Sequence, residues 1–284
     1  MTLPIQLTRA ARPATYEVEA VDEKGAVVPT SIAGEHPLTL YLDRRELVTL
    51  MTLGGAPEAL ALGYLRNQRI VDDVARIAAV QVDWETGSVA VTTHGRDFWD
   101  QAGIEERLSR RTVTTGCGQG TVFGDLMEAL DAVRLPEDVR ITQEVLYTVM
   151  ERVRKHESIY KQAGAVHGCA LCSNTGETRG EIVYFVEDVG RHNAVDAIAG
   201  RMWLDGVGGA DKIFYTTGRL TSEMVIKCAQ MGIPVLLSRS GLTQMGYEIA
   251  RRVGITMIGR CQGRHYLLFT GERRFVAPAA TLFA

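Results

Sequence analysis

Arginine residues recur just after the predicted strands in the second half of the chain, where each strand gives way to a loop or a helix. Guanidinium groups offer paired N–H donors suited to phosphate, and helix N-termini add backbone N–H groups. A glycine or a small hydroxyl residue lies near each arginine and would let a ligand approach the backbone closely. In open α/β sheets, ligands bind outside the carboxyl ends of the strands. The pattern therefore predicts a site for a polyanion, most simply one with several phosphates, built from Arg191, Arg219, Arg239 and Arg260.

Two observations limit this prediction. Each arginine could instead pair with a nearby carboxylate, such as Glu187, Asp188 or Glu223, although this is a weaker explanation for all four together. The neighbouring glycines form neither a GxGxxG fingerprint nor a phosphate-binding P-loop. A simple dinucleotide or ATPase site is therefore not indicated.

The segment 187–193, EDVGRHN, is dense in titratable groups. His192 lies beside an arginine and close to two acids, so it is a candidate proton carrier. The alternative is structural: Asp188 would accept backbone N–H groups as the N-cap of the following helix, and Arg191 would be solvated. The residues alone leave both interpretations open.

Cys117 stands in the segment TTGCGQG, residues 114–120, where three glycines surround one thiol. Such a loop leaves the sulfur uncrowded, as a cysteine needs if it is to accept an atom and pass it on. The alternative is a small, inert thiol buried at a tight turn. The residues alone do not decide between the two.

The other four cysteines have weaker claims to chemistry. Cys169 and Cys172 form a CxxC with His167 two residues before it, but no second CxxC or histidine pair completes a tetrahedral zinc site. We expect structural cysteines there and no metal, with a redox pair or a metal ligand as the alternatives. Cys228 lies within a predicted helix and is expected in the core, and Cys261 could line a site without reacting.

Composition indicates an ordinary globular protein. The chain has 284 residues, of which 46% are hydrophobic and 23% charged, so disorder and coiled coil are excluded as its main class. Its 31 basic and 34 acidic residues give a net charge of −3, so a general nucleic-acid binder is not expected. No apolar run approaches the ~18 residues of a membrane span, and no secretory signal is recognised. An odd number of cysteines, five, favours free thiols in a reducing cytoplasm.

Hydrophobic periodicity divides the chain in two. Residues 1–112 hold strand-like alternation around one helix, which predicts a smaller α+β domain. Residues 113–284 alternate nearly continuous apolar strands with amphipathic helices, which predicts a larger α/β domain with a largely parallel sheet covered on both faces. Strands are expected at 15–21, 37–43, 45–52, 76–84, 88–94, 180–188, 212–217, 234–238, 255–259 and 265–270, and helices at 57–68, 142–156, 193–203, 221–231 and 243–253.

Several motifs of the second half agree, in order, with one family. They are TGCGQG, AVHGCAL, EDVGRHNAVDAIAGR, TTGRLTSEMVIKCAQMGIPVLLSRSGLT and ITMIGRCQGRHYLLFT, and they run from about residue 110 to residue 270. The chain resembles the formate dehydrogenase accessory sulfurtransferases of the FdhD/NarQ family. The N-terminal segments SIAGEHPLTLYLD and GAPEALALGYL fit the family more loosely.

The resemblance implies a cytoplasmic maturation factor for molybdenum- or tungsten-dependent formate dehydrogenase. Such proteins pass persulfide sulfur from a cysteine desulfurase to the Mo-bis(molybdopterin guanine dinucleotide) cofactor, which they bind as cargo. A guanine nucleotide such as GDP is expected to mimic that cargo. The resemblance also implies a cytidine-deaminase-like, three-layer larger domain, a homodimer, and contact with the catalytic subunit of formate dehydrogenase.

The resemblance also assigns roles to particular residues. Cys117 is the expected persulfide carrier and therefore the catalytic residue, and loop 260–265 is the expected cofactor-binding segment. Together with residues from the other motifs, the expected cofactor-binding set is Arg260, Cys261, Gln262, Gly263, Arg264, His265, Arg219, Arg239, Ser238, His192, Arg191 and His167.

The sequence departs from the family pattern at Gly120, where the second cysteine of a CxxC-like motif is usual. A disulfide within that loop is therefore impossible, but a persulfide needs only one thiol. A non-catalytic chaperone that binds and delivers the cofactor is the alternative function, and a regulator that only reads guanine nucleotides is a third. Cytidine deamination is not expected, because Cys169 stands two residues after His167 where zinc deaminases have glutamate.

Overall fold

The computed structural model of the chain describes residues 4–95, 112–113, 120–121 and 130–277. They form two units that interleave along the sequence, whereas the periodicity divides the chain once, between residues 112 and 113. No helix within the described ranges is long and apolar enough to cross a membrane. The first unit takes residues 1–126, 157–168 and 186–207, and the second takes 127–156, 169–185 and 208–284.

A five-stranded sheet forms the core of the first unit, with the strand order β1-β6-β7-β4-β5. Its strands alternate buried and more exposed residues; Leu38, Leu40 and Leu42 of β4, for example, are fully buried. This period of two matches the pleat of a strand with one covered face. The strands are β1 (Gln6–Leu7), β4 (His36–Leu42), β5 (Arg45–Thr52), β6 (Ile77–Asp83) and β7 (Ser88–Thr93), and a short 3₁₀ turn, Val74–Arg76, precedes β6.

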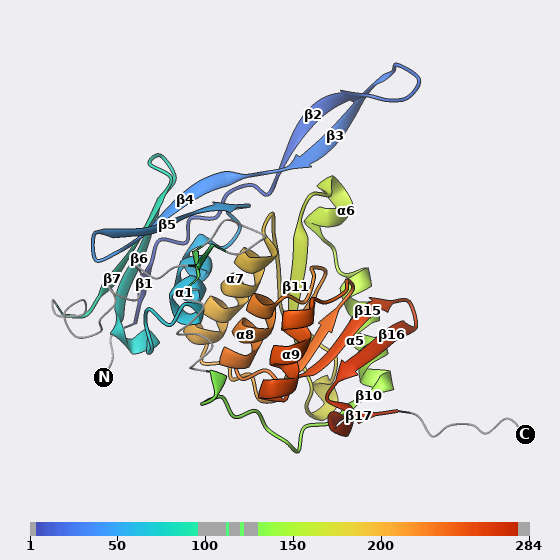
Figure 1. The fold of residues 1–284 in the computed structure, drawn as a ribbon. Helices are drawn as coiled ribbons and strands as arrows, with labels where there is room; N and C mark the ends of the chain where they lie inside the picture. The colour runs from blue at the N-terminus through green and yellow to red at the C-terminus, as the bar shows by residue number, and fades with distance from the viewer. Residues whose placement is uncertain (1–3, 96–111, 114–119, 122–129, 278–284) are drawn as a thin grey trace, which may run out of the picture. The chain divides into compact units, whose positions relative to one another are not determined.

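A separate antiparallel hairpin joins β1 to β4 along the chain (Figure 1). It consists of β2 (Thr15–Val21) and β3 (Val27–Ala33). Glu17 and Glu19 alternate along β2 with the apolar residues Tyr16 and Val18, so the two faces of the hairpin differ in polarity. The sequence pattern predicts β2 but not β3.

Two helices of the first unit, α1 (Pro57–Asn67) and α7 (Arg191–Leu204), cross at glycines. A methyl group added to Gly63 would lie 1.6 Å from the carbonyl oxygen of Asp196, and one added to Gly200 would lie 1.9 Å from that of Ala59. Each helix therefore lets the backbone of the other approach closely because the glycine lacks a side chain. The crossing is also held by a hydrogen bond from the Asn67 amide to the Asp196 carboxylate, 2.7 Å.

A six-stranded mixed sheet organises the second unit, with the order β12-β11-β13-β14-β15-β16. Strands β13, β14 and β15 are parallel, whereas β11 pairs antiparallel with β13 and β16 pairs antiparallel with β15. The expectation of a largely parallel sheet is therefore wrong. The strands are β11 (His167–Ser173), β12 (Ile182–Asp188), β13 (Lys212–Thr216), β14 (Val235–Ser238), β15 (Thr256–Gln262) and β16 (His265–Thr270).

The tight connection between β15 and β16 accounts for part of this difference. Gln262 pairs with His265, and Gly263 in the turn has a φ of 61°. A turn this short can join only antiparallel strands, since a parallel return needs a crossover of a dozen residues or more. Two short strands, β10 (Ile141–Thr142) and β17 (Phe275–Val276), form a further parallel pair.

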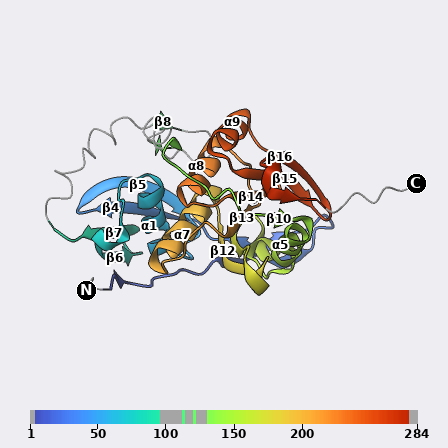
Figure 2. The same cartoon turned by 90° about the horizontal axis from the view of Figure 1, so that it is seen from below.

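Helices cover both faces of this sheet, so the second unit has three layers (Figures 1 and 2). Leu146 and Val149 of α5 pack against one face, in a core that includes Ile213 of β13 and Leu237 of β14. Helices α8 and α9 cover the other face. The bounds are α5 (Gln143–Lys155), α8 (Ser222–Gln230) and α9 (Gln244–Val253), and the remaining short helical turns of the chain are α6 (Ile159–Ala163), Gly176–Thr178 and Glu272–Arg274.

The mixed α/β class expected from the sequence is confirmed, as is every helix and strand that the periodicity predicts. The cytidine-deaminase-like detail stays a prediction.

Candidate functional site

The carboxyl ends of β13 and β14 are joined by hydrogen bonds of small polar groups. The hydroxyl of Thr216 accepts the N–H of Gly218 at 3.0 Å, and the hydroxyl of Ser238 donates to the Gly218 carbonyl at 2.6 Å. The Arg239 N–H donates to the Thr216 carbonyl at 3.1 Å. Thr216 and Ser238 are fully buried. These bonds fix the backbone from which the next residues emerge.

The end of β15 joins the same network. The Ser240 N–H donates to the Ser238 hydroxyl at 2.9 Å, and the Arg260 N–H donates to the Ser240 carbonyl at 2.9 Å. Arg260 has a φ of 54°, a left-handed conformation that is uncommon for residues other than glycine. The chain bulges there, since the pairing of β15 with β16 shifts register between Gly259 and Gln262. This strained backbone is held in place by its neighbours.

Three of the predicted arginines therefore emerge along one edge of the sheet. Arg219 and Arg239 follow the ends of β13 and β14, Arg260 lies near the end of the neighbouring parallel strand β15, and all three are exposed. Adjacent strands lie about 4.8 Å apart, so the guanidinium groups start from closely spaced backbone positions. The arrangement is suited to a ligand with several negative charges.

The β15–β16 turn adds a fourth exposed arginine to this edge. The guanidinium of Arg264 lies over the ring of Tyr147, with its central carbon 5.7 Å from the ring centroid. The Tyr147 hydroxyl donates to the Arg264 carbonyl at 3.1 Å. Tyr147 of α5 therefore contacts both the backbone and the side chain of Arg264. Gln262, Gly263 and His265 are exposed in the same turn.

Cys261 and Ser238 of the expected set are buried, so neither side chain is exposed to a ligand at this edge. Ser238 instead holds the backbone of Gly218 and Ser240 in place. The remaining members of the expected set, His167, Arg191 and His192, belong to the first unit. Arg191 is 6% exposed and His192 is 1% exposed. The structural alternative in which Arg191 is solvated is therefore wrong, because α7 is buried on nearly all sides.

Asp188 holds the start of α7 and the end of β5 together. One carboxylate oxygen accepts the N–H of Gly190 and the amide of Asn193, and the other accepts the hydroxyl of Thr52 and the N–H of Leu53. The N-cap of α7 is Gly190 and not Asp188. Burial is the largest influence on this carboxyl and raises its pKa, although all four hydrogen bonds oppose that shift. The motif EDVGRHN therefore has a structural role at this residue.

We expect Asp188→Asn to lower the free energy of unfolding by about 3 kcal/mol. In one orientation the new NH₂ group faces the N–H groups of Gly190 and Asn193, and in the other it faces the N–H of Leu53. Each unsatisfied donor costs about 1–3 kcal/mol. Urea unfolding followed by circular dichroism measures the loss. The control is Asp22→Asn, because one oxygen of the half-buried Asp22 accepts both N–H groups of its turn in solvent-exposed hydrogen bonds, and an amide can keep that oxygen in place. Equal effects of the two variants would contradict the role of Asp188.

The four described cysteines are free and buried. Burial raises the pKa of Cys172 and of Cys261 to about 12, and raises that of Cys228 well above its usual value. The Sγ of Cys169 lies 3.4 Å from the hydroxyl of Thr216. No group of residues in the described ranges could hold a metal ion. These thiols fit the structural role expected of them.

Native alkylation tests this description of the thiols. At pH 8, a pKa of about 12 leaves about one thiolate in 10,000, and the thiolate is the form that reacts. We expect iodoacetamide to leave Cys172 and Cys261 unmodified in the native protein and to modify both after unfolding in guanidinium chloride. Peptide mass spectrometry measures the modification. Labelling of either native thiol at the rate of free cysteine would contradict their burial.

Cys117 lies outside the described residues. The strands on either side are described: β8 (Thr112–Val113) pairs antiparallel with β9 (Gly120–Thr121), with Val113 opposite Gly120. Val113 and Gly120, the described residues on either side of segment 114–119, are therefore adjacent. Gly120, where the family pattern has a second cysteine, stands at the first position of β9.

Comparison with known proteins gives the family. The sequence profile of the FdhD/NarQ family matches residues 33–276. The chain belongs to this family. The sulfur carrier protein FdhD of Listeria monocytogenes serovar 1/2a is 31% identical over 249 residues, which cover 87% of this chain and 92% of that one. The protein of the same name from Bacillus subtilis strain 168 is 26% identical over 254 residues, 89% of this chain and 94% of its own.

A solved structure of this FdhD/NarQ group has the same fold. It is a crystal structure described as a formate dehydrogenase accessory protein from Desulfotalea psychrophila, with a TM-score of 0.70 and 25% sequence identity. The match covers 92% of this chain and 98% of the other. The resemblance inferred from the motifs is therefore confirmed.

Proposed function

We propose that this FdhD/NarQ protein is a sulfur carrier that matures formate dehydrogenase. Cys117 accepts persulfide sulfur from a cysteine desulfurase and passes it on for the Mo-bis(molybdopterin guanine dinucleotide) cofactor of the enzyme's catalytic subunit. The names of the relatives support the sulfur-carrier role. The observation that carries the assignment to Cys117 is the burial of the four other cysteines, which keeps those thiols from reacting.

Loading of the carrier requires no outside electrons. The thiolate of Cys117 attacks the outer sulfur of the donor persulfide; a new S–S bond forms while the donor S–S bond breaks, and the donor leaves as a thiolate. Release of that sulfur as hydrosulfide needs a second thiol, which attacks the inner sulfur and is left in a mixed disulfide with Cys117. Because Gly120 replaces the second cysteine, we assign this step to a thiol from another molecule.

Incubation with a cysteine desulfurase and cysteine tests the proposal. The expected product is the protein with one added sulfur atom, located in the Cys117 peptide by mass spectrometry and removed by a reducing thiol. Sulfur found on Cys169, Cys172, Cys228 or Cys261 in its place would overturn the assignment.

The exposed arginines at the carboxyl edge of the sheet are the proposed binding site for the cofactor as cargo. Arg219, Arg239, Arg260 and Arg264 supply guanidinium groups, and the loops between them supply backbone N–H groups. This donor set is suited to the phosphates of a guanine dinucleotide. A protein with this edge but without a working thiol would be a chaperone that delivers the finished cofactor, which is the second candidate function and is favoured by Gly120.

We expect Arg260→Ala to weaken GDP binding at least tenfold, since a charge-assisted hydrogen bond contributes about 1.5–3 kcal/mol. Isothermal titration calorimetry measures the affinity. Arg260→Gly separates the two roles of this residue, because glycine tolerates the left-handed φ while the guanidinium is lost. Arg154→Ala, an exposed position on α5, is the control. If Arg260→Gly bound GDP with wild-type affinity, the Arg260 guanidinium would not be part of the binding site.

A further inference from the structure

Two cavities open at the opposite edge of the same sheet, where β15 begins. Their volumes are about 300 Å³ and about 640 Å³, and both lie within the second unit. They share Glu137, Arg251, Gly254 and Arg274. Gly254 and Ile255, which line the larger cavity where β15 begins, are five to six residues along the chain from Arg260, or roughly 17–20 Å in an extended strand. At its other end the ring of Phe269 reaches Gly259, so it is the arginines of this cavity, and not all of its walls, that lie apart from the proposed cofactor site.

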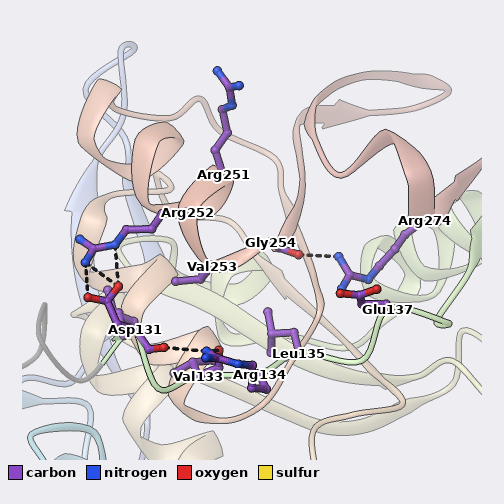
Figure 3. Close-up of a pocket in the computed structure, with 11 residues that line it drawn as sticks. Asp131, Val133, Arg134, Leu135, Glu137, Arg251, Arg252, Val253, Gly254 and Arg274 are labelled. Carbon is purple, nitrogen blue, oxygen red and sulfur yellow. Dashed lines mark hydrogen bonds and ion pairs between the residues drawn. The ribbon is translucent and has the colours of Figure 1, made fainter.

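The charged groups of the smaller cavity bond to one another (Figure 3). Two guanidinium nitrogens of Arg252 donate hydrogen bonds to the Asp131 carboxylate, at 2.5–2.9 Å. Arg134 donates to the backbone carbonyls of Asp131 and Val133. Arg251, in contrast, points away from this group (Figure 3). The guanidinium groups of Arg252 and Arg134 are therefore already engaged by the protein itself.

Arg274 offsets the negative end of α9, which would otherwise repel an anion. It is 8% exposed and donates to the carbonyl of Gly254, the C-cap residue of the helix, and to that of Pro136. Burial is the largest influence on this guanidinium and lowers its pKa. The unpaired carbonyls at a helix C-terminus carry partial negative charge, and a buried cation there compensates it.

The larger cavity has more positive than negative charge on its walls. Four arginines, at 140, 251, 273 and 274, face two glutamates, at 137 and 272, although the whole chain has a net charge of −3. Arg273 forms no ion pair with any residue that the structure describes. Arg140 donates through one nitrogen to the carbonyls of Glu137 and Val139, which leaves its other N–H groups available.

Compensation of the α9 dipole accounts for only part of this charge. Arg251 lies in the last turn of α9, where a cation is stabilising without any ligand. Arg140 and Arg273 lie on other segments, and Arg274 already serves the helix end. Their convergence on one cavity needs a different explanation.

Aromatic and aliphatic groups form the remaining walls. Tyr247 and Phe269 line the cavity, with Ala250 and Ile255 buried at its base. The guanidinium of Arg251 lies over the Tyr247 ring, 5.8 Å from its centroid, which holds it on this side of the helix. A volume of about 640 Å³ is within the ~300–1,000 Å³ range of small-molecule sites. Aromatic side chains beside a few convergent cations are typical of a site for a flat organic anion.

We propose that this cavity binds an aromatic phosphate ester of the size of a nucleoside monophosphate. Arg251, Arg273 and the free N–H groups of Arg140 hold the phosphate, and the aromatic group packs between Tyr247 and Phe269. The site is a second anion site of the chain, separate from the one at the carboxyl edge.

Calorimetry on the full chain with adenosine 5′-monophosphate, adenosine and inorganic phosphate as probes tests the proposal. The monophosphate is expected to bind at least tenfold more tightly than either fragment, since it alone uses both the cations and the aromatic walls. The double variant Arg251→Gln, Arg273→Gln is expected to lose at least tenfold in affinity. Both positions are exposed, so the fold is expected to survive.

Arg154→Gln, at an exposed position on α5, serves as the control and is expected to bind the monophosphate as the wild type does. Arg260→Gly, which removes a guanidinium of the carboxyl edge, is measured beside it. Three results would overturn the proposal: no heat of binding at millimolar monophosphate, equal affinity for phosphate alone, or loss of binding in Arg260→Gly with none in the double variant. The last result would assign the monophosphate to the carboxyl edge. None of the three bears on sulfur transfer by Cys117.

Discussion

Cys117→Ser is expected to abolish maturation of formate dehydrogenase, with a fall in its activity of at least ~100-fold. A serine hydroxyl cannot form a persulfide. The other four cysteines are buried, so their thiols cannot replace Cys117 as the carrier. The assay is formate oxidation in cells that lack their own accessory protein and receive this chain or its variant. The loaded sulfur, measured on purified protein, is expected to disappear in parallel.

A matched control is Cys228→Ala, which removes a fully buried thiol from α8. It tests whether loss of any cysteine, and not of the carrier alone, lowers maturation. If Cys117→Ser still supports formate dehydrogenase while Arg260→Gly does not, the chain acts as a chaperone for the cofactor. Loss of activity in both variants would mean that carriage of sulfur and recognition of the cargo are both required.

Gly63→Ala is expected to lower the free energy of unfolding by about 3 kcal/mol or more. The new methyl group would lie 1.6 Å from the Asp196 carbonyl oxygen and 2.8 Å from the nitrogen of Gly200, so α1 and α7 must move apart. Overpacking of a core usually costs about 1–3 kcal/mol, and here the obstacle is backbone that cannot change rotamer. Urea unfolding, with the slope compared between variants, measures the loss.

Gly55→Ala is the control for this substitution. Gly55 lies just before α1, and a methyl group there would meet no atom within 4 Å. The replacement is therefore expected to change stability by less than about 1 kcal/mol. Equal stability of the Gly63→Ala and Gly55→Ala variants would contradict the close approach of α1 and α7 at Gly63.

The helices and most strands could be predicted because their signals are local. The alternation in 45–52 and the amphipathic pattern in 142–156 follow from burial of one face, and both elements form where expected. Strand direction has no such signal. The antiparallel pairing of β11 with β13 depends on which partner each strand meets, and periodicity is the same for either direction.

The edge that carries the proposed cofactor site was predictable to a similar degree. An arginine near the end of each strand indicated a shared edge, and three of the four lie at the ends of neighbouring parallel strands. The burial of Arg191 was not predictable from its own segment, because it results from packing of α7 within the first unit. The supporting hydroxyls of Thr216 and Ser238 were visible only as small residues near the strand ends.

The crossing of α1 and α7 at glycines cannot form until both helices have been synthesised on the ribosome. Helix α1 ends at Asn67, but its partner α7 is complete only at Leu204. At about 5–20 residues per second, the synthesis of the intervening segment takes roughly 7–27 s. During that interval the apolar surface of α1 has no α7 to cover it, so this part of the core stays exposed until more than two thirds of the chain has been made.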